Sequence, residues 1–262
     1  MNLELRHKNA LVCGSTAGIG KATALMLAQE GANVTLLARN EDKLKAVLQE
    51  LATTGGQQHG YVVADFNHPE QVKEAVEKRL GTIGAIHILV NNTGGPAAGP
   101  VYEASLDAFA KAFTQHLQCN QILAQTVIPG MKKAGYGRII NVISTSVKQP
   151  LDGLGVSNTI RGAVANWSKT LANEMGPFGI TVNNVLPGAT ATGRLAEIIE
   201  NKAKKSGGNE EEVSAKMKSS VPAQRFAEPE ELASAISFLA SARAAYINGI
   251  NLPVDGGRTK CL

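Results

Sequence analysis

The chain alternates short apolar runs with longer segments in which apolar residues recur every three or four positions. Short apolar runs are typical of buried strands, and the longer spacing is typical of helices that cover a sheet. Because parallel strands need a helical crossover between them, the alternation predicts an α/β fold with one doubly wound parallel sheet of about seven strands and helices on both faces. The predicted strands are 10–13, 34–37, 61–64, 86–90, 138–143, 181–186 and 250–254, and the predicted helices are 22–30, 41–51, 69–80, 106–131, 160–175 and 229–239.

The length of 262 residues suits a single Rossmann-type domain, 1–262, because sheets of this type reach roughly 250 residues as one unit. No repeat or flexible linker divides the chain. The segment 189–221 is polar and is longer than an ordinary connection, so we expect it to form a lid over a substrate.

Charge and apolar content bear on the partners of the chain. The net charge is +4, and the positive residues are spread along the chain, which predicts no nucleic-acid and no membrane partner. The longest apolar runs are far shorter than the ~18 residues that span a bilayer, and the first residues lack the apolar core of a signal peptide, so we expect a soluble, cytoplasmic protein. Cys13, Cys119 and Cys261 fit no disulfide or zinc spacing, so no metal site is expected.

A glycine-rich segment joins the first predicted strand to the first predicted helix. Backbone N–H groups at such a turn, together with the positive end of the helix dipole, favour bound phosphates. Glycines also end strands for purely conformational reasons, and this alternative stays open on the motif alone. The predicted phosphate-binding residues are Gly14, Ser15, Thr16, Gly18, Ile19 and Gly20.

The end of the second predicted strand indicates which dinucleotide is bound. NAD-binding sites place an acidic residue about 20 positions after the glycines, where it accepts a hydrogen bond from the ribose 2′-OH. This chain has Arg39 there. Because a guanidinium pairs with a 2′-phosphate, Arg39 favours NADP over NAD, although an arginine that begins a surface loop is also a common solvated residue.

The glycine spacing Gly-x-x-x-Gly-x-Gly resembles that of the short-chain dehydrogenase/reductase superfamily, and other matching motifs cover nearly the whole chain. These motifs are Ala64-Asp65-Phe66, Asn91-Asn92-Thr93-Gly94, Pro187-Gly188 and Val254-Asp255-Gly256-Gly257. The chain is most similar to reductases resembling 3-oxoacyl-acyl-carrier-protein reductase, and to a divergent branch with Asn-Thr-Gly-Gly-Pro. The resemblance implies an NADP(H)-dependent oxidoreductase that forms a homotetramer or homodimer. It adds Asp65, Phe66, Asn92, Gly94, Pro187 and Gly188 to the cofactor-binding residues.

The catalytic pattern of the superfamily is incomplete in this chain. The family has a serine, a tyrosine thirteen residues later and a lysine four residues after that, with an asparagine on the preceding long helix. Ser144 matches the serine, whereas Ser157 and Arg161 stand where the family has tyrosine and lysine, and His116 stands where it has asparagine. The resemblance therefore makes Ser144, Ser157, Arg161 and His116 the candidate catalytic residues, and it places Arg161 at the cofactor as well.

The chemistry of these side chains limits their roles. A tyrosine phenol has a pKa near about 10 and can be tuned toward neutrality, whereas the pKa of a serine hydroxyl is several units higher. Ser157 is therefore expected to orient a carbonyl oxygen and not to supply a proton. Arg161 lies one helical turn from Ser157 and can bind the nicotinamide ribose hydroxyls through its fork of donors. His116 has the pKa range for proton transfer, although a lone helix histidine is more often structural.

Two functions fit these observations. The first is an NADP(H)-dependent reductase that acts on a small-molecule carbonyl substrate, such as a 3-oxoacyl compound. The second is a nucleotide-binding protein without reductase activity that serves as a sensor or assembly partner, which the missing tyrosine also supports. We favour the enzyme because the glycine- and proline-rich loop 94–100 and the insert 189–221 suit a substrate site. Tyr102, which follows that loop, either enters the site or packs the loop.

Overall fold

Seven parallel strands form one sheet in the order β3-β2-β1-β4-β5-β6-β7. The computed structural model describes residues 2–261, apart from the side chains of residues 205 and 206. The strand order reverses between β1 and β4, which is the switch point of a doubly wound sheet and confirms the predicted fold class. The strands are β1 (Asn9–Cys13), β2 (Asn33–Ala38), β3 (Gly60–Val63), β4 (Ile88–Asn91), β5 (Gly137–Val142), β6 (Ile180–Pro187) and β7 (Asn251–Val254).

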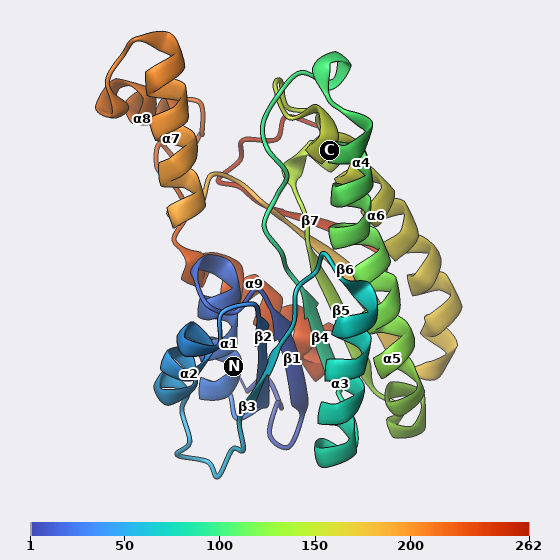
Figure 1. Cartoon of the computed structure of the whole chain (residues 1–262). Helices are drawn as coiled ribbons and strands as arrows, with labels where there is room; N and C mark the ends of the chain where they lie inside the picture. The colour runs from blue at the N-terminus through green and yellow to red at the C-terminus, as the bar shows by residue number, and fades with distance from the viewer. Residues whose placement is uncertain (1, 262) are drawn as a thin grey trace.

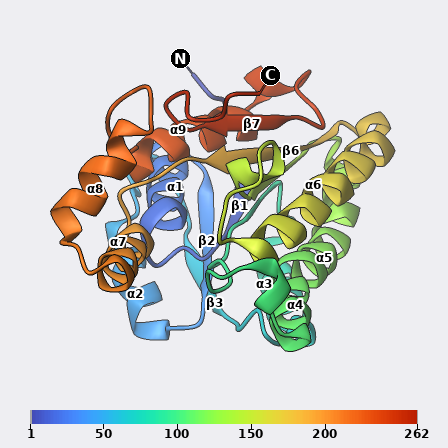
Figure 2. The same ribbon diagram turned by 90° about the horizontal axis from the view of Figure 1, so that it is seen from above.

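Helices cover both faces of this sheet (Figures 1 and 2). One face carries α1 (Gly18–Gln29), α2 (Glu41–Glu50) and α9 (Pro229–Ala240). The other side carries α3 (Pro69–Ile83), α4 (Leu106–Phe113), α5 (Cys119–Ala134) and α6 (Gly155–Met175).

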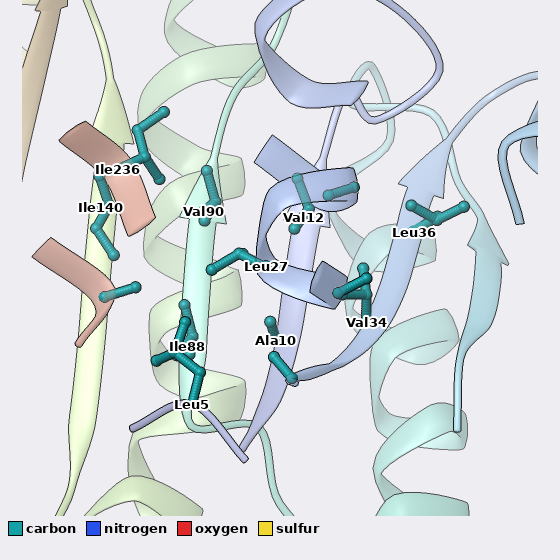
Figure 3. Packing of buried hydrophobic residues seen from close by; sticks show 14 of the residues in the cluster. Leu5, Ala10, Val12, Leu27, Val34, Leu36, Ile88, Val90, Ile140 and Ile236 are labelled. Atoms are coloured by element: carbon teal, nitrogen blue, oxygen red, sulfur yellow. The ribbon is translucent and has the colours of Figure 1, made fainter. Parts of the chain in front are cut away.

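Alternate side chains of each central strand enter different cores, because successive residues of a strand point to opposite faces. Ala10 and Val12 of β1 pack with Leu27 and Ile236 from the α1 and α9 side, as Figure 3 shows. Leu11, between them, belongs to the core under α3 and α5. Burial of both faces explains why these strands are continuous apolar runs in the sequence.

The predicted helix 106–131 is not one regular α-helix. After α4 the chain forms a π-helical segment, Thr114–Gln118, and then continues as α5. A π turn widens the helix by one residue and is often found at functional sites. His116 lies within this segment, so the backbone is irregular at one of the predicted site residues.

The polar insert 189–221 contains two helices, α7 (Gly193–Ser206) and α8 (Glu210–Ser219). The side chains of Thr192 and Asn209 cap them by accepting hydrogen bonds from backbone N–H groups three residues later. In Figure 1 both helices project away from the body of the sheet. That this insert forms a lid over a substrate stays a prediction.

Four asparagine side chains form a chain of hydrogen bonds across the sheet from β4 to β7, and all but the half-buried Asn251 are buried. Asn91 donates to Asn141 (2.8 Å), Asn141 donates to Asn184 (2.9 Å), and Asn184 donates to Asn251 (2.8 Å). Asn141 also donates to the hydroxyl of Ser168 on α6 at 3.2 Å. Because the four residues are direct partners in the strand register, these amides join four strands at one level of the sheet.

None of the helices formed by residues 2–261 combines the length and the apolar character needed to cross a membrane.

Candidate active site

The predicted site residues follow the carboxyl ends of successive strands, where doubly wound sheets bind ligands. Gly14 follows β1, Arg39 follows β2, Asp65 follows β3, Asn92 follows β4, Ser144 follows β5, and Gly188 follows β6.

The glycine-rich turn is closely packed against the end of β4. Gly14 has a φ of +60°, and a Cβ on Gly14 would lie 2.7 Å from the Asn92 carbonyl oxygen. A Cβ on Gly20 would lie 2.2 Å from the Gly14 carbonyl oxygen. The Asn92 amide donates to the carbonyl oxygen of Cys13 at 3.2 Å. These contacts require glycine at both positions and hold the turn close to the start of α1.

The N-cap residue of α1 is Ala17, which has no side chain that could accept a hydrogen bond from the N–H groups of the first turn. Uncapped N–H groups together with the helix dipole make an anion site. Ser15 has a different role, because its buried hydroxyl accepts a hydrogen bond from the Leu37 N–H at 3.0 Å and so ties the turn to β2.

A cavity of about 580 Å³ opens beside this turn. Arg39 and Lys43 line one end of it, and neither forms an ion pair within the described chain. Asp65 lies in the same cavity; burial opposes its ionisation, but hydrogen bonds from Asn67 and the charge of Arg39 bring its pKa below the usual value. The other lining residues include Gly14, Thr16, Ala38, Asn40, Ala64, Phe66, Asn92, Thr93, Gly94, Gly95, Pro96, Ala97 and Lys111. The residues that line the cavity thus come from the ends of β1 to β4 and from the loop after β4.

Two serines lie at the far end of the same sheet edge. Ser144 is half-buried after β5, and its hydroxyl accepts from the Ser146 N–H at 3.1 Å. Ser157 is half-buried in the first turn of α6, one helical turn before Arg161. Both hydroxyls can therefore donate a hydrogen bond to a ligand.

Arg161 is a buried cation. One of its terminal nitrogens, Nη1, donates to the Val142 carbonyl oxygen at 2.7 Å, whereas the buried Nε has no hydrogen-bond partner among the described residues. Burial and the charge of Arg194 lower the pKa of Arg161 to about 10, so Arg161 is still charged at neutral pH.

His116 is buried beside Arg161. Burial and the positive charge of Arg161 lower its pKa to about 2, although a hydrogen bond with the Gly94 backbone opposes this shift. The imidazole is therefore neutral near pH 7, and its buried Nε2 has no partner within the described chain. A neutral imidazole can donate or accept a hydrogen bond, but it holds no acidic proton to deliver.

Sequence reasoning missed Arg194, which lies in the first turn of α7. Its Nη2 donates to the Pro96 carbonyl oxygen at 2.8 Å, which connects the insert to the loop after β4. The insert also contacts the glycine-rich turn, because the Thr192 Cγ2 atom lies 3.0 Å from where a Cβ on Gly18 would be. An arginine in a polar insert gives no sequence signal of its own, since only the fold brings it to the loop 94–100. Tyr102 does not enter the site, because its side chain is 89% exposed.

Comparison with known proteins decides the family. A family model described as enoyl-(acyl carrier protein) reductase matches residues 14–259. The chain belongs to the short-chain dehydrogenase/reductase family.

Members of the short-chain dehydrogenase/reductase family match this chain over its whole length. The 3-oxoacyl-[acyl-carrier-protein] reductase FabG of Aquifex aeolicus is 32% identical and covers 98% of this chain and 99% of its own. The NADPH-dependent reductase BacG of Bacillus subtilis is 28% identical, with 98% and 100% covered. The crystal structure of L-sorbose reductase from Gluconobacter frateurii, complexed with NADPH and L-sorbose, is 34% identical, covers 100% of both chains and has a TM-score of 0.94.

Proposed function

We propose that this protein is an NADP(H)-dependent reductase of a small carbonyl compound. The observation that carries the proposal is one cavity lined both by Gly14 and Thr16, from the turn that leads into the uncapped α1, and by the cations Arg39 and Lys43. The first feature suits a diphosphate, and the two cations suit a 2′-phosphate. BacG and L-sorbose reductase, which are NADPH-dependent or bind NADPH, support the same cofactor.

The chain's residues fit a dinucleotide because the glycine turn is packed too closely for a Cβ at Gly14 or Gly20, and Gly14 and Thr16 of this turn line the cavity. We assign the diphosphate to the turn and the first turn of α1, the 2′-phosphate to Arg39, and the adenine to Asp65 and Phe66. Asn92, Gly94 and Arg161 hold the ribose on the nicotinamide side, and Pro187 and Gly188 border it. In this assignment Ser15 acts by fixing the turn to β2.

Bound NADPH would supply the hydride for the reaction. Ser157 and Ser144 donate hydrogen bonds to the carbonyl oxygen, and the charge of Arg161 stabilises the negative charge that develops there. Because His116 is neutral and its pKa is far below 7, we propose that it positions Arg161 and the loop at Gly94, and that water supplies the proton to the oxygen. The helices α7 and α8 cover the substrate.

The decisive measurement is the rate of NADPH and NADH oxidation by the purified protein over a panel of ketones, aldehydes and oxoacyl thioesters. Ser157→Ala should slow turnover by about 10²-fold while NADPH affinity changes little, because the hydroxyl acts mainly in the transition state. Thr159→Ala, an exposed position on the same helix, is the matched control. Tight NADPH binding without turnover on any substrate would instead favour the nucleotide-binding protein without reductase activity.

We also propose that two or four copies associate through α4 and α5. Leu106 and Phe113 are exposed on α4, and Phe113 lines an apolar groove of about 450 Å³ together with Leu117, Ile122 and Trp167 among others. Light scattering of the purified protein measures this state directly, and a monomer at micromolar concentration would contradict it.

A further inference from the structure

Two arginine side chains from distant parts of the chain converge on the loop after β4. Arg161 comes from α6 and Arg194 from α7. Measured from the position that a Cβ on Gly95 would occupy, Nη2 of Arg194 lies at 3.7 Å and Nη2 of Arg161 at 3.9 Å. The two guanidinium groups are therefore no farther apart than the sum of these distances, and no side chain stands between them at Gly95.

Nothing in the described chain neutralises this pair. The five ion pairs among the described residues involve other side chains, so no described carboxylate lies within 4.0 Å of either guanidinium. Arg161 is only 8% exposed, and its Nε lacks a partner. A buried charge without a counter-ion is costly, and a second cation beside it adds repulsion. Binding of an anion beside the two guanidinium groups would therefore be favourable.

A carboxylate suits this position. Its two oxygens can each accept from one planar guanidinium fork, and such charge-assisted bonds are among the strongest in proteins. The missing side chain at Gly95 leaves the space that the carboxylate needs, and the loop with Gly95 also lines the cavity described above.

We propose that Arg161 and Arg194 bind a carboxylate of the substrate over Gly95, so that the preferred substrates are oxo acids. This inference rests on the proposed reductase function and names its substrate class. The other available anion is a phosphate of the cofactor. We favour the substrate because the diphosphate has its own donors at α1, whereas Arg194 belongs to the insert that covers the substrate.

The first experiment compares short 2-, 3- and 4-oxo acids with their methyl esters, which keep the carbonyl but lose the charge. We expect the unmodified protein to reduce at least one acid with a kcat/KM about 100-fold above that of its ester. Arg194→Ala should bring this ratio below 10. Arg243→Ala removes an exposed arginine that is paired with Glu4 and serves as the control. Equal ratios in the unmodified protein and in Arg194→Ala would overturn the proposal.

NADPH affinity distinguishes the two sources of the anion. If the pair binds the substrate, the NADPH dissociation constant of Arg194→Ala should stay within about threefold of that of the unmodified protein. A tenfold or larger loss of NADPH affinity, with an unchanged ratio of acid to ester, would assign the pair to the cofactor and overturn the proposal.

A second pair of variants tests the site without relying on turnover. Gly95→Asp places a carboxylate between the two guanidinium groups, whereas Gly95→Asn places a neutral side chain of the same shape there. We expect the Asp variant to melt several degrees above the Asn variant at low salt and to lose its preference for acids. Equal melting temperatures and an intact preference for acids would show that the pair does not bind a carboxylate.

A last experiment distinguishes failure of the carboxylate site from failure of the proposed reductase function. If no carbonyl compound is reduced, calorimetric titration with oxamate, a carboxylate that resembles a 2-oxo acid, still tests the pair. Binding that Arg194→Ala abolishes would support the anion site alone, and no binding to the unmodified protein would overturn it.

Discussion

At the scale of single residues, we propose that Arg39 sets the preference of the site for NADPH over NADH. It lines the cavity together with Lys43 and is exposed there, so it is free to meet a 2′-phosphate. NADPH should bind at least about tenfold more tightly than NADH, which corresponds to about 1.4 kcal/mol. Arg39→Asp should remove this preference. Calorimetric titration with both nucleotides checks the prediction, and equal affinities in the unmodified protein would refute it.

His116 should make the stability of the protein depend on pH. Its pKa falls from the ordinary 6.5 to about 2 on folding, through burial first and the charge of Arg161 second. Below pH 6.5 the unfolded chain therefore takes up a proton that the folded chain refuses until about pH 2, and the free energy of unfolding decreases as the pH falls. The contribution approaches about 1.4 kcal/mol per pH unit.

Chemical denaturation between pH 6.5 and 4.5 measures this dependence. His116→Asn should show a shallower decrease than the unmodified protein, whereas His68→Asn, at an exposed position, should not. The lowered pKa of His87 acts in the same direction, but it is present in all three proteins and cancels in the comparison. Parallel curves for the unmodified protein and His116→Asn would contradict the prediction.

At the scale of elements, the turn between β1 and α1 depends on the absence of one side chain. Gly20→Ala would bring a Cβ against the Gly14 carbonyl oxygen, and such overpacking costs about 1–3 kcal/mol of stability. The turn would have to open, so NADPH affinity should fall as well. Gly81→Ala is the matched control, because this glycine lies inside α3 with open space around it, and alanine there should stabilise the helix by about 0.5–1 kcal/mol. Denaturant titration and nucleotide binding measure both effects.

The strands were predictable because both faces of the sheet are buried, which leaves unbroken apolar runs such as that of β4. The π-helical segment at Thr114–Gln118 could not be predicted, since the spacing of apolar residues does not distinguish a π turn from the α-helical turn that is narrower by one residue. The two helices of the insert were missed because their exposed faces give the whole segment a polar composition.

The sequence likewise predicts some features of the candidate site and not others. Motifs predicted the glycine turn, Arg39 and Ser144 because each follows a strand. Ser157 was predicted from its spacing of thirteen residues after Ser144. The low pKa of His116 and the proximity of Arg161 to Arg194 depend on burial and on contacts between distant segments, so no local pattern could show them.

At the scale of the whole molecule, the amide chain from Asn91 to Asn251 joins four strands below the site. Asn141 is its most connected member, with bonds to Asn91, Asn184 and Ser168. Asn141→Ala would remove the partner of the Asn91 amide nitrogen, of the Asn184 amide oxygen and of the Ser168 hydroxyl, and each buried polar atom left unpaired costs about 1–3 kcal/mol. We expect the free energy of unfolding to drop by at least about 3 kcal/mol. Asn166→Ala, at an exposed position of α6, should change it by less than about 0.5 kcal/mol.

The same chain of amides limits the order in which its four positions can diverge in evolution. An apolar residue that first appears at Asn141 or Asn184 leaves unpaired amides on two neighbouring strands at once. Asn251 has one partner in the chain and is half-buried, so water can take its place. Neutral substitutions can therefore begin at Asn251 in β7 and then follow at the next asparagine inward, one strand at a time. A substitution that begins at Asn141 or Asn184 needs a second, compensating substitution to persist.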